Sequence, residues 1–171
     1  GVSWASAKII GQYINPINAI FLRFLFSATT LIPVVFFLKQ KLTFKKIPLM
    51  IIIVSSILLA IYNFCFFKGT KLGEAGIGGV LVTATNPIIT IVFMAFIDKR
   101  KLIKKEILGL LGGIIGSALI VDIVQQDLNK IFQSGNVYFI LCSIIWSVLT
   151  VFTSKKINQS QFINFIFFTY M

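Results

Sequence analysis

The sequence predicts an all-α polytopic membrane protein, and three observations predict this fold class. The chain is 57% hydrophobic and 12% charged, with a mean hydropathy of +0.96. Its apolar residues form long runs, whereas a soluble core of this length shows amphipathic helices or alternating strands. Short basic segments separate the runs, as connections separate membrane helices. The lipid bilayer is therefore the expected environment of the chain.

The basic residues give the chain a net charge of +11, from 16 Lys and Arg against 5 Asp and Glu. A nucleic-acid-binding protein gathers such residues on one face or arm, but here they lie between the apolar runs. No nucleic-acid partner is therefore predicted. There is no His, and Cys65 and Cys142 each lie in an apolar run. We expect no metal site, no cofactor and no disulfide framework.

Taken in order, the apolar runs predict six helices and the beginning of a seventh. They span residues 1–14, 17–38, 47–67, 72–96, 107–124, 136–154 and 162–171. The chain begins at Gly1 without Met and stops at Met171 inside an apolar run. We therefore expect it to be a fragment of a longer protein.

The connections between the runs predict the orientation of the helices. Their numbers of Lys and Arg are, in order, zero, four, two, five, one and two, so every second connection is more basic than its neighbours. Short basic connections stay in the cytosol. We therefore expect a multi-pass protein of the cytoplasmic membrane with a cytosolic N-terminus.

The fourth predicted helix, residues 72–96, carries the most informative pattern. Pro87 has no N–H, so the carbonyl of Thr83 loses its helical partner, and we expect a helix break there. In lipid, broken backbone survives only against protein or a water-filled cavity. One face of this helix carries small and polar residues, namely Gly76, Gly79, Thr83, Asn86 and Thr90. This stripe predicts a packing seam, the wall of a midplane binding site, or both.

Two basic residues, Lys8 and Arg23, lie inside predicted helices. A cation at mid-bilayer costs about 2.5–3.5 kcal/mol, so it usually faces the interior of the bundle. Facing inward, both side chains are suited to hold a carboxylate or phosphate of a substrate. Because both lie near the outer ends of their helices, they can alternatively extend to the membrane interface.

Polar and aromatic residues inside the runs complete the candidate site. Asn63, next to Tyr62 in the third predicted helix, needs a partner on another helix or on a ligand. Trp4 and Trp146 are either interfacial anchors or aromatic walls of a pocket. The candidate substrate-binding residues are Trp4, Lys8, Arg23, Tyr62, Asn63, Thr83, Asn86 and Trp146.

Small and polar residues also mark the fifth and sixth predicted helices. The fifth contains two interleaved G-x-x-x-G pairs, formed by Gly109, Gly112, Gly113 and Gly116. Such glycines predict close packing against neighbouring helices. The sixth carries a polar stripe of Ser143, Ser147, Thr150 and Ser154. This stripe serves either interhelical hydrogen bonding or the lining of a cavity.

The order and spacing of several motifs resemble the EamA-type members of the drug/metabolite transporter superfamily, over most of the chain. The matching motifs are Trp4 with Lys8, Asn15-Pro16 before Arg23-Phe24, Tyr62, Asn86-Pro87 after small residues, and an acidic-basic exit before the glycine-rich helix. The chain departs from the family pattern at Asp98, where the family usually has Glu. A second copy of the Trp-Lys pattern is only partly visible, as Trp146 before Lys155-Lys156.

The resemblance implies ten helices arranged as two inverted five-helix repeats with a substrate cavity between them. Residues 1–124 would then form the first repeat, truncated at its N-terminus. Residues 125–135 would form an external loop, and residues 136–171 would begin the second repeat. The predicted topology agrees, because the first helix runs outward and the sixth runs inward.

The sequence thus predicts a secondary transporter, not an enzyme, that exports a small metabolite such as an amino acid or related compound by alternating access. Its acidic residues lie at helix ends or in connections, so no mid-membrane proton carrier is visible, unlike in the small multidrug exporters of the superfamily. A non-catalytic membrane subunit is the first alternative. A membrane enzyme acting on lipid or prenyl phosphate is the second, although no constellation of acid, base or metal groups is visible.

Overall fold

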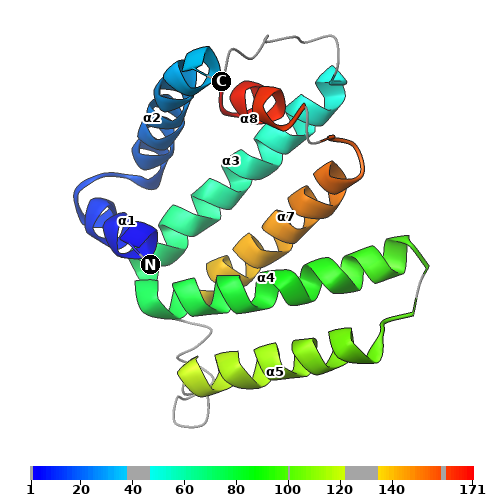
Figure 1. Cartoon of the computed structure of the whole chain (residues 1–171). Coiled ribbons are helices and arrows are strands. Elements are labelled where there is room, and N and C mark those ends of the chain that lie inside the picture. The colour runs from blue at the N-terminus through cyan, green and yellow to red at the C-terminus, as the bar shows by residue number, and fades with distance from the viewer. Residues whose placement is uncertain (1, 38–46, 100, 122–134, 159–160) are drawn as a thin grey trace.

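The computed structural model describes residues 2–37, 47–99, 101–121, 135–158 and 161–171, and in these ranges the chain is helical without strands. The helices are α1 (Val2–Tyr13), α2 (Pro16–Phe37), α3 (Leu49–Leu72), α4 (Ala75–Ile97), α5 (Lys104–Val121), α7 (Asn136–Ser154) and α8 (Phe162–Tyr170) (Figure 1). The predicted all-α fold class is confirmed, and α7 has the predicted bounds.

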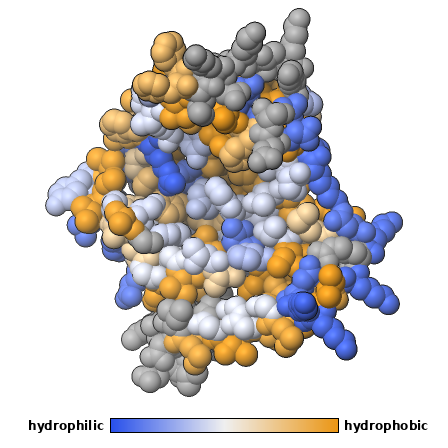
Figure 2. All heavy atoms as spheres, in the orientation of Figure 1, coloured by the Kyte–Doolittle hydropathy of each residue, from blue (hydrophilic) through white to orange (hydrophobic). Residues whose placement is uncertain are grey.

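Four helices of the described residues are long and apolar enough to cross a membrane: α2, α3, α4 and α7. The 23 residues of α4 rise about 34 Å, which exceeds the roughly 30 Å of a hydrocarbon core. Large apolar side chains are exposed as well as buried, and apolar patches lie on the face shown in Figure 2. The chain is therefore a multi-pass membrane protein.

Three predicted helix boundaries are wrong by three residues or more, and one of them is the start of α5, which begins at Lys104 instead of residue 107. α3 continues to Leu72 instead of ending at residue 67, and α4 begins at Ala75 instead of residue 72. Lys68 and Lys71 therefore lie in the last turns of α3 and not in a connection. Cations near a helix C-terminus interact favourably with its last carbonyls, so these lysines are compatible with helix up to Gly73.

The helix break predicted at Pro87 is also corrected. α4 is helical from Ala75 to Ile97 with Pro87 inside it. Proline removes one N–H from the ladder, but neighbouring helices and hydroxyl side chains allow membrane helices to continue through it. Residues 122–124 of the fifth predicted helix and residues 125–134 of the predicted external loop lie outside the described residues.

α7 lies between α3 and α4 and packs against both (Figure 1). α5 packs against α4 on the side away from α7. α1 contacts both α3 and α4, whereas α2 and α8 contact α3 and each other. This arrangement brings α1, α3, α4 and α7 together at one end of the molecule.

The packing of α7 depends on two glycines that face the ring of Phe139. Phe139 is fully buried, at 0% exposure. A Cβ atom added to Gly69 of α3 would lie 2.7 Å from this ring, and one added to Gly78 of α4 would lie 2.5 Å from it. Both distances are below van der Waals contact, so only glycine leaves room for the ring at these positions.

The connections at opposite ends of the bundle are held by different contacts. Gly135, which precedes α7, has a φ of +80° and packs against Gly73, which ends α3. At the other end, Ile47 and Ile51 form a second apolar cluster with Phe165 of α8. Gly135 is therefore required both by its left-handed backbone and by the close approach of the α3–α4 turn.

We predict that Gly78→Ala destabilises the full-length protein, because its Cβ would overlap the Phe139 ring. Overpacking of this kind costs about 1–3 kcal/mol, which should lower the thermal denaturation midpoint in detergent. Gly76→Ala is the matched control on the same helix, because a Cβ there meets nothing within 4 Å. The control should be neutral or stabilising, since Ala favours helix over Gly by about 1 kcal/mol. Equal midpoints for the two variants would contradict the packing.

Candidate functional site

Five aromatic residues from α1, α3 and α7 pack together and form what we call the aromatic cluster. The Trp4 ring lies 4.6 Å from the Phe66 ring and 5.6 Å from that of Phe139, centroid to centroid. The Tyr62 ring lies 4.9 Å from the Trp146 ring and 6.2 Å from the Phe66 ring. Trp4 and Trp146, which are far apart in sequence, thus belong to one continuous aromatic surface.

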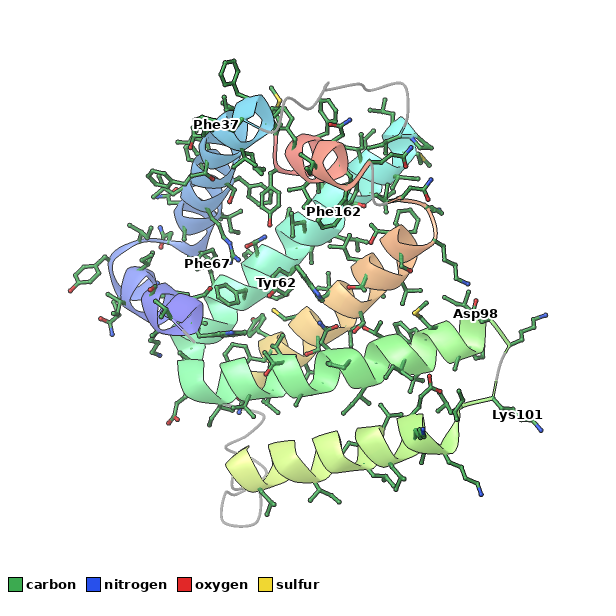
Figure 3. All side chains as sticks on the ribbon, viewed as in Figure 1. Phe37, Tyr62, Phe67, Asp98, Lys101 and Phe162 are labelled. Atoms are coloured by element: carbon green, nitrogen blue, oxygen red, sulfur yellow. The ribbon has the colours of Figure 1, made fainter. Side chains whose placement is uncertain are left out.

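Arg23 lies at the edge of this cluster. Its guanidinium carbon is 5.0 Å from the centroid of the Phe66 ring and 5.9 Å from that of Phe67. Figure 3 shows Phe67 and Tyr62 projecting from the same stretch of α3. A guanidinium at such distances is attracted by the negative face of the ring. Arg23 is partly buried, and its charge is directed toward α3.

A cavity of about 330 Å³ opens beside Arg23, between α1, α2 and α3. Ser3 and Ser6 of α1 supply its other polar side chains, and Phe66 and Phe67 form part of its apolar wall. The volume is within the roughly 300–1,000 Å³ of small-molecule sites. A permanent cation, two hydroxyl groups and aromatic walls suit a small molecule that has an anionic group and an apolar part.

The side chain of Lys8 is bound to protein carbonyls at the end of α3. Its ammonium donates hydrogen bonds to the carbonyl oxygens of Gly73, at 2.8 Å, and Lys71, at 3.3 Å. These oxygens lie at a helix C-terminus, where cations satisfy carbonyls and interact well with the helix dipole. Lys8 therefore joins α1 to the α3–α4 turn.

Asn86 forms a polar link between α4 and α7. Ser147, which is fully buried, donates from its hydroxyl to Asn86 Oδ1 at 2.8 Å and to the Asn86 carbonyl at 3.1 Å. Thr90 also donates to Asn86 Oδ1, at 3.3 Å. Asn86 and Ser147, members of two separate predicted stripes, are thus brought together by the structure.

Asn63 and Thr83 differ in how their polar atoms are satisfied. Asn63 is 1% exposed, and its Nδ2 donates to the Leu59 carbonyl at 2.8 Å. Its Oδ1 has no hydrogen-bond partner among the described residues, which is costly for a buried oxygen. Thr83 is exposed, and its hydroxyl donates to the Gly79 carbonyl of its own helix at 2.6 Å. The described part of the chain therefore does not bring Thr83 into the aromatic cluster.

The glycines of α5 have little contact with the rest of the described chain. A Cβ at Gly109, Gly112 or Gly116 would meet nothing within 4 Å, and one at Gly113 would lie 3.8 Å from Ile88 of α4. The predicted packing is thus seen only at Gly113 in the residues that the structure covers. Close packing of the other three glycines stays a prediction for the longer protein.

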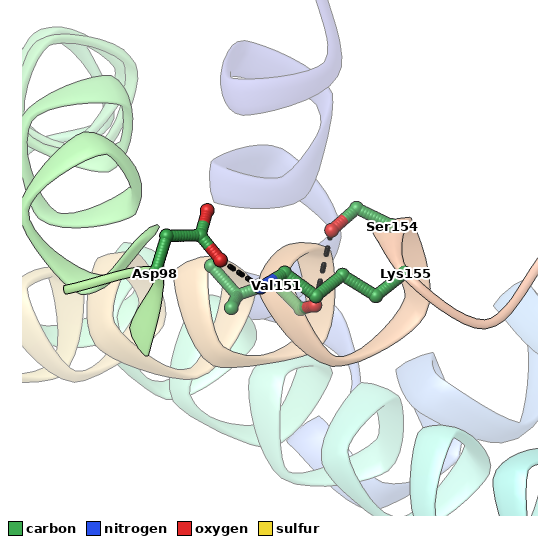
Figure 4. Close-up of polar contacts among 4 residues, drawn as sticks. All are labelled: Asp98, Val151, Ser154 and Lys155. Carbon is green, nitrogen blue, oxygen red and sulfur yellow. Dashed lines mark hydrogen bonds and ion pairs between the residues drawn. The ribbon is translucent and has the colours of Figure 1, made fainter. Parts of the chain in front are cut away.

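An ion pair connects the far ends of α4 and α7. Lys155, directly after α7, pairs with Asp98, directly after α4 (Figure 4). Nearby, the hydroxyl of Ser154 donates to the Val151 carbonyl at 3.0 Å. The Lys155 and Asp98 side chains are 44% and 33% exposed, so the pair adds at most about 1 kcal/mol. Among the described residues, no His, Cys, Asp and Glu side chains gather in a group that could hold a metal ion.

Sequence reasoning missed three aromatic residues of this region: Phe66, Phe67 and Phe139. A signal for Phe66 was present, because it lies one helical turn after Tyr62 and so shares its face. The Phe139 position could not be found from spacing alone, since it is set by glycines on two other helices.

Comparisons with known proteins show that the chain is similar to membrane transporters. The model of the EamA-like transporter family matches residues 1–122. Two proteins of Bacillus subtilis (strain 168), the uncharacterized transporters YyaM and YoaV, are each 24% identical over 165 residues. The match to YyaM covers 93% of this chain and 53% of YyaM. The match to YoaV covers 96% of this chain and 56% of YoaV. The chain thus spans about half the length of these relatives. No solved structure matches it significantly.

We predict that Lys8→Met lowers the thermal stability of the full-length protein, because it removes the ammonium from the carbonyls of Lys71 and Gly73. A cation at a helix C-terminus contributes about 0.3–2 kcal/mol to the free energy of unfolding. Lys8→Arg keeps the charge and should therefore retain most of this stabilisation. Lys105→Met, at an exposed position of α5, is the matched control. The denaturation midpoint in detergent measures all three, and a Lys8→Met midpoint equal to that of the control would refute the capping role.

Proposed function

Because the chain belongs to the EamA-like transporter family, we propose that the full-length protein carries a small metabolite, such as an amino acid or related compound, out of the cell by alternating access. Three features of the described residues support this proposal. They are the cavity beside Arg23, the buried acceptor of Asn63, and the two polar links between α4 and α7.

The single observation that carries the proposal is the cavity beside Arg23. Its guanidinium contacts aromatic rings and makes no ion pair with an acid in the described part of the chain. A cation without a counter-charge among the described residues of a membrane bundle is suited to an anionic ligand group. We assign Arg23 to the carboxylate or phosphate of the substrate, with Ser3 and Ser6 as further donors.

The aromatic cluster and Asn63 would contact the rest of the substrate. Asn63 lies one helical turn from Phe66 and Phe67, whose rings contact Arg23. Its Oδ1, which has no partner in the described part of the chain, is suited to accept a hydrogen bond from an ammonium or hydroxyl group. Trp4, Tyr62 and Trp146 supply apolar walls. Lys8 has a role in the protein itself, so we propose that it acts on the substrate only through the position of α1.

Alternating access would involve movement at the α4–α7 contact. In this proposal residues 1–124 are the first repeat, residues 125–135 an external loop, and residues 136–171 the beginning of the second repeat. Asn86 with Ser147, and Asp98 with Lys155, then join the two repeats. Such polar links can break and form again when packed helices shift relative to one another. The N-terminus is proposed to be cytosolic, because the basic connections alternate.

A non-catalytic membrane subunit is the second candidate function. The observation that favours it is the uncovered face of α5, where three of the four glycines meet nothing within 4 Å. Glycine faces of this kind let helices of a partner approach closely. Since the relatives are about twice as long as this chain, the remainder of the same protein is an equally good source of such helices.

We predict that Arg23→Gln reduces transport at least tenfold, because it removes a charge-assisted hydrogen bond of about 1.5–3 kcal/mol to the substrate. The measurement is counterflow in proteoliposomes with the full-length protein and pools of amino acids, nucleosides and sugar phosphates. Asn86→Ala, which breaks the link to Ser147, should slow transport while substrate still binds.

The matched control is Lys101→Gln, which removes one positive charge at an exposed position far from the cavity. It should leave counterflow unchanged. Equal activity in Arg23→Gln and the control would remove the cavity from the substrate path. Absence of counterflow with every pool in folded wild-type protein would favour the membrane subunit.

A further inference from the structure

A second cavity, of about 320 Å³, lies between the last turns of α4 and α7, and it shares no lining residue with the cavity beside Arg23. Its walls are the side chains of Phe93 and Ile97 from α4 and of Val148, Val151 and Phe152 from α7. Lys155 and Lys156, which follow α7, form its remaining lining. We call this space the α4–α7 groove. It combines an apolar wall with two cations at the ends of membrane helices.

The two lysines keep hydrogen-bonding capacity for a ligand. Lys155 pairs with Asp98, but an ammonium has three N–H donors, and this side chain is 44% exposed. The Lys156 ammonium lies 3.9 Å from the centroid of the Phe152 ring, so it is placed directly over the apolar wall of the groove. Both lysines belong to the lining of the same groove, so both positive charges act on an anion bound there.

The surroundings of the groove are strongly basic. Six exposed lysines lie at this end of the described chain: Lys99, Lys101, Lys104, Lys105, Lys155 and Lys156. The acidic residues described at the same end are two, Asp98 and Glu106. Asp98 is paired with Lys155, and Glu106 accepts a hydrogen bond from the Ile103 N–H at 3.0 Å. The hydrophilic right-hand edge in Figure 2 belongs to this end of the molecule.

The depth of the groove fits a lipid rather than a soluble anion. α4 is long enough to cross the hydrocarbon core, so its last turn, with Ile97, reaches the headgroup region. The lysines then lie at headgroup level, and Phe93 and Val148 lie deeper along the apolar wall. A soluble anion has no part that packs along this wall, whereas an acyl chain can follow it in van der Waals contact.

We propose that the α4–α7 groove binds an anionic phospholipid, with its phosphate at Lys155 and Lys156 and the upper part of an acyl chain along Phe93 and Val148. Basic pockets at the ends of membrane helices are suited to anionic headgroups. This binding site does not rest on the proposed function, because it requires only that the chain spans the membrane. The lipid would hold the ends of α4 and α7 together alongside the ion pair of Asp98.

The test compares full-length protein in detergent with added phosphatidylglycerol or phosphatidylcholine, by native mass spectrometry and by the thermal denaturation midpoint. We expect phosphatidylglycerol to be retained and to raise the midpoint more than phosphatidylcholine does. The double variant Lys155→Gln/Lys156→Gln should bind phosphatidylglycerol at least tenfold more weakly, because each lysine near a membrane surface contributes substantially to anionic lipid attraction.

Two matched controls separate the groove from general effects. Lys104→Gln/Lys105→Gln removes the same charge at the same end of the molecule but outside the groove, and should keep the preference. Asp98→Asn breaks the same ion pair as Lys155→Gln while both lysines remain, and should keep or strengthen lipid binding. If Lys104→Gln/Lys105→Gln weakened phosphatidylglycerol binding as much as Lys155→Gln/Lys156→Gln does, the proposal would be overturned. Binding would then reflect general attraction of the basic surface for anionic lipid.

A variant that fills the groove tests the acyl-chain part of the site independently. Val148→Trp retains every charge and should abolish the preference for phosphatidylglycerol without lowering the midpoint in its absence. Glycerol phosphate, the headgroup chemistry without the acyl chains, should not compete. Competition by glycerol phosphate, or no preference for phosphatidylglycerol in the wild-type protein, would overturn the proposal. A lower midpoint of Val148→Trp in the absence of lipid, with no lipid bound by the wild type, would assign the groove to another segment of the longer chain.

Discussion

The contact of the Phe139 ring with Gly69 and Gly78 is the constraint on which the remaining packing depends. Helices in lipid gain little from hiding apolar surface, so they associate through close approach and interhelical hydrogen bonds. Two glycines on adjacent helices supply that close approach, and α7 lies between α3 and α4 as a result. Trp4 then packs on the same ring and brings α1 to this end of the bundle.

Most polar groups near this core are satisfied by the protein itself. Lys8 binds carbonyls at the end of α3, Ser147 binds Asn86, and Thr70 donates to a carbonyl of its own helix. Against this background two groups stand out. Arg23 has aromatic neighbours but no described acidic partner, and Asn63 has a buried oxygen without a described donor. Ser55 Oγ is likewise buried without a described partner, but only Arg23 and Asn63 lie beside the aromatic cluster, and we propose these two as contacts for the solute.

The fold class and the bounds of α7 could be predicted from the sequence, because both depend on local hydropathy and on the basic connections. It was insufficient wherever the outcome depended on which helices are neighbours. The carbonyl partners of Lys8 lie at the end of α3, and the ring that explains Gly78 belongs to α7. The expected break at Pro87 failed for a different reason: losing one N–H weakens a helical ladder without ending it.

The gap between Gly69 and Gly78 also bears on the biogenesis of the protein. Both glycines belong to a hairpin that leaves the ribosome well before α7 is made, so the hairpin enters the membrane with its central contact unfilled. Lys8 can hold α1 to the hairpin turn at that stage, because its partners are already synthesised. The core itself closes only when α7 delivers Phe139. The packing between α3 and α4 is therefore completed only after α7 has been inserted, later than the insertion of α1 to α5.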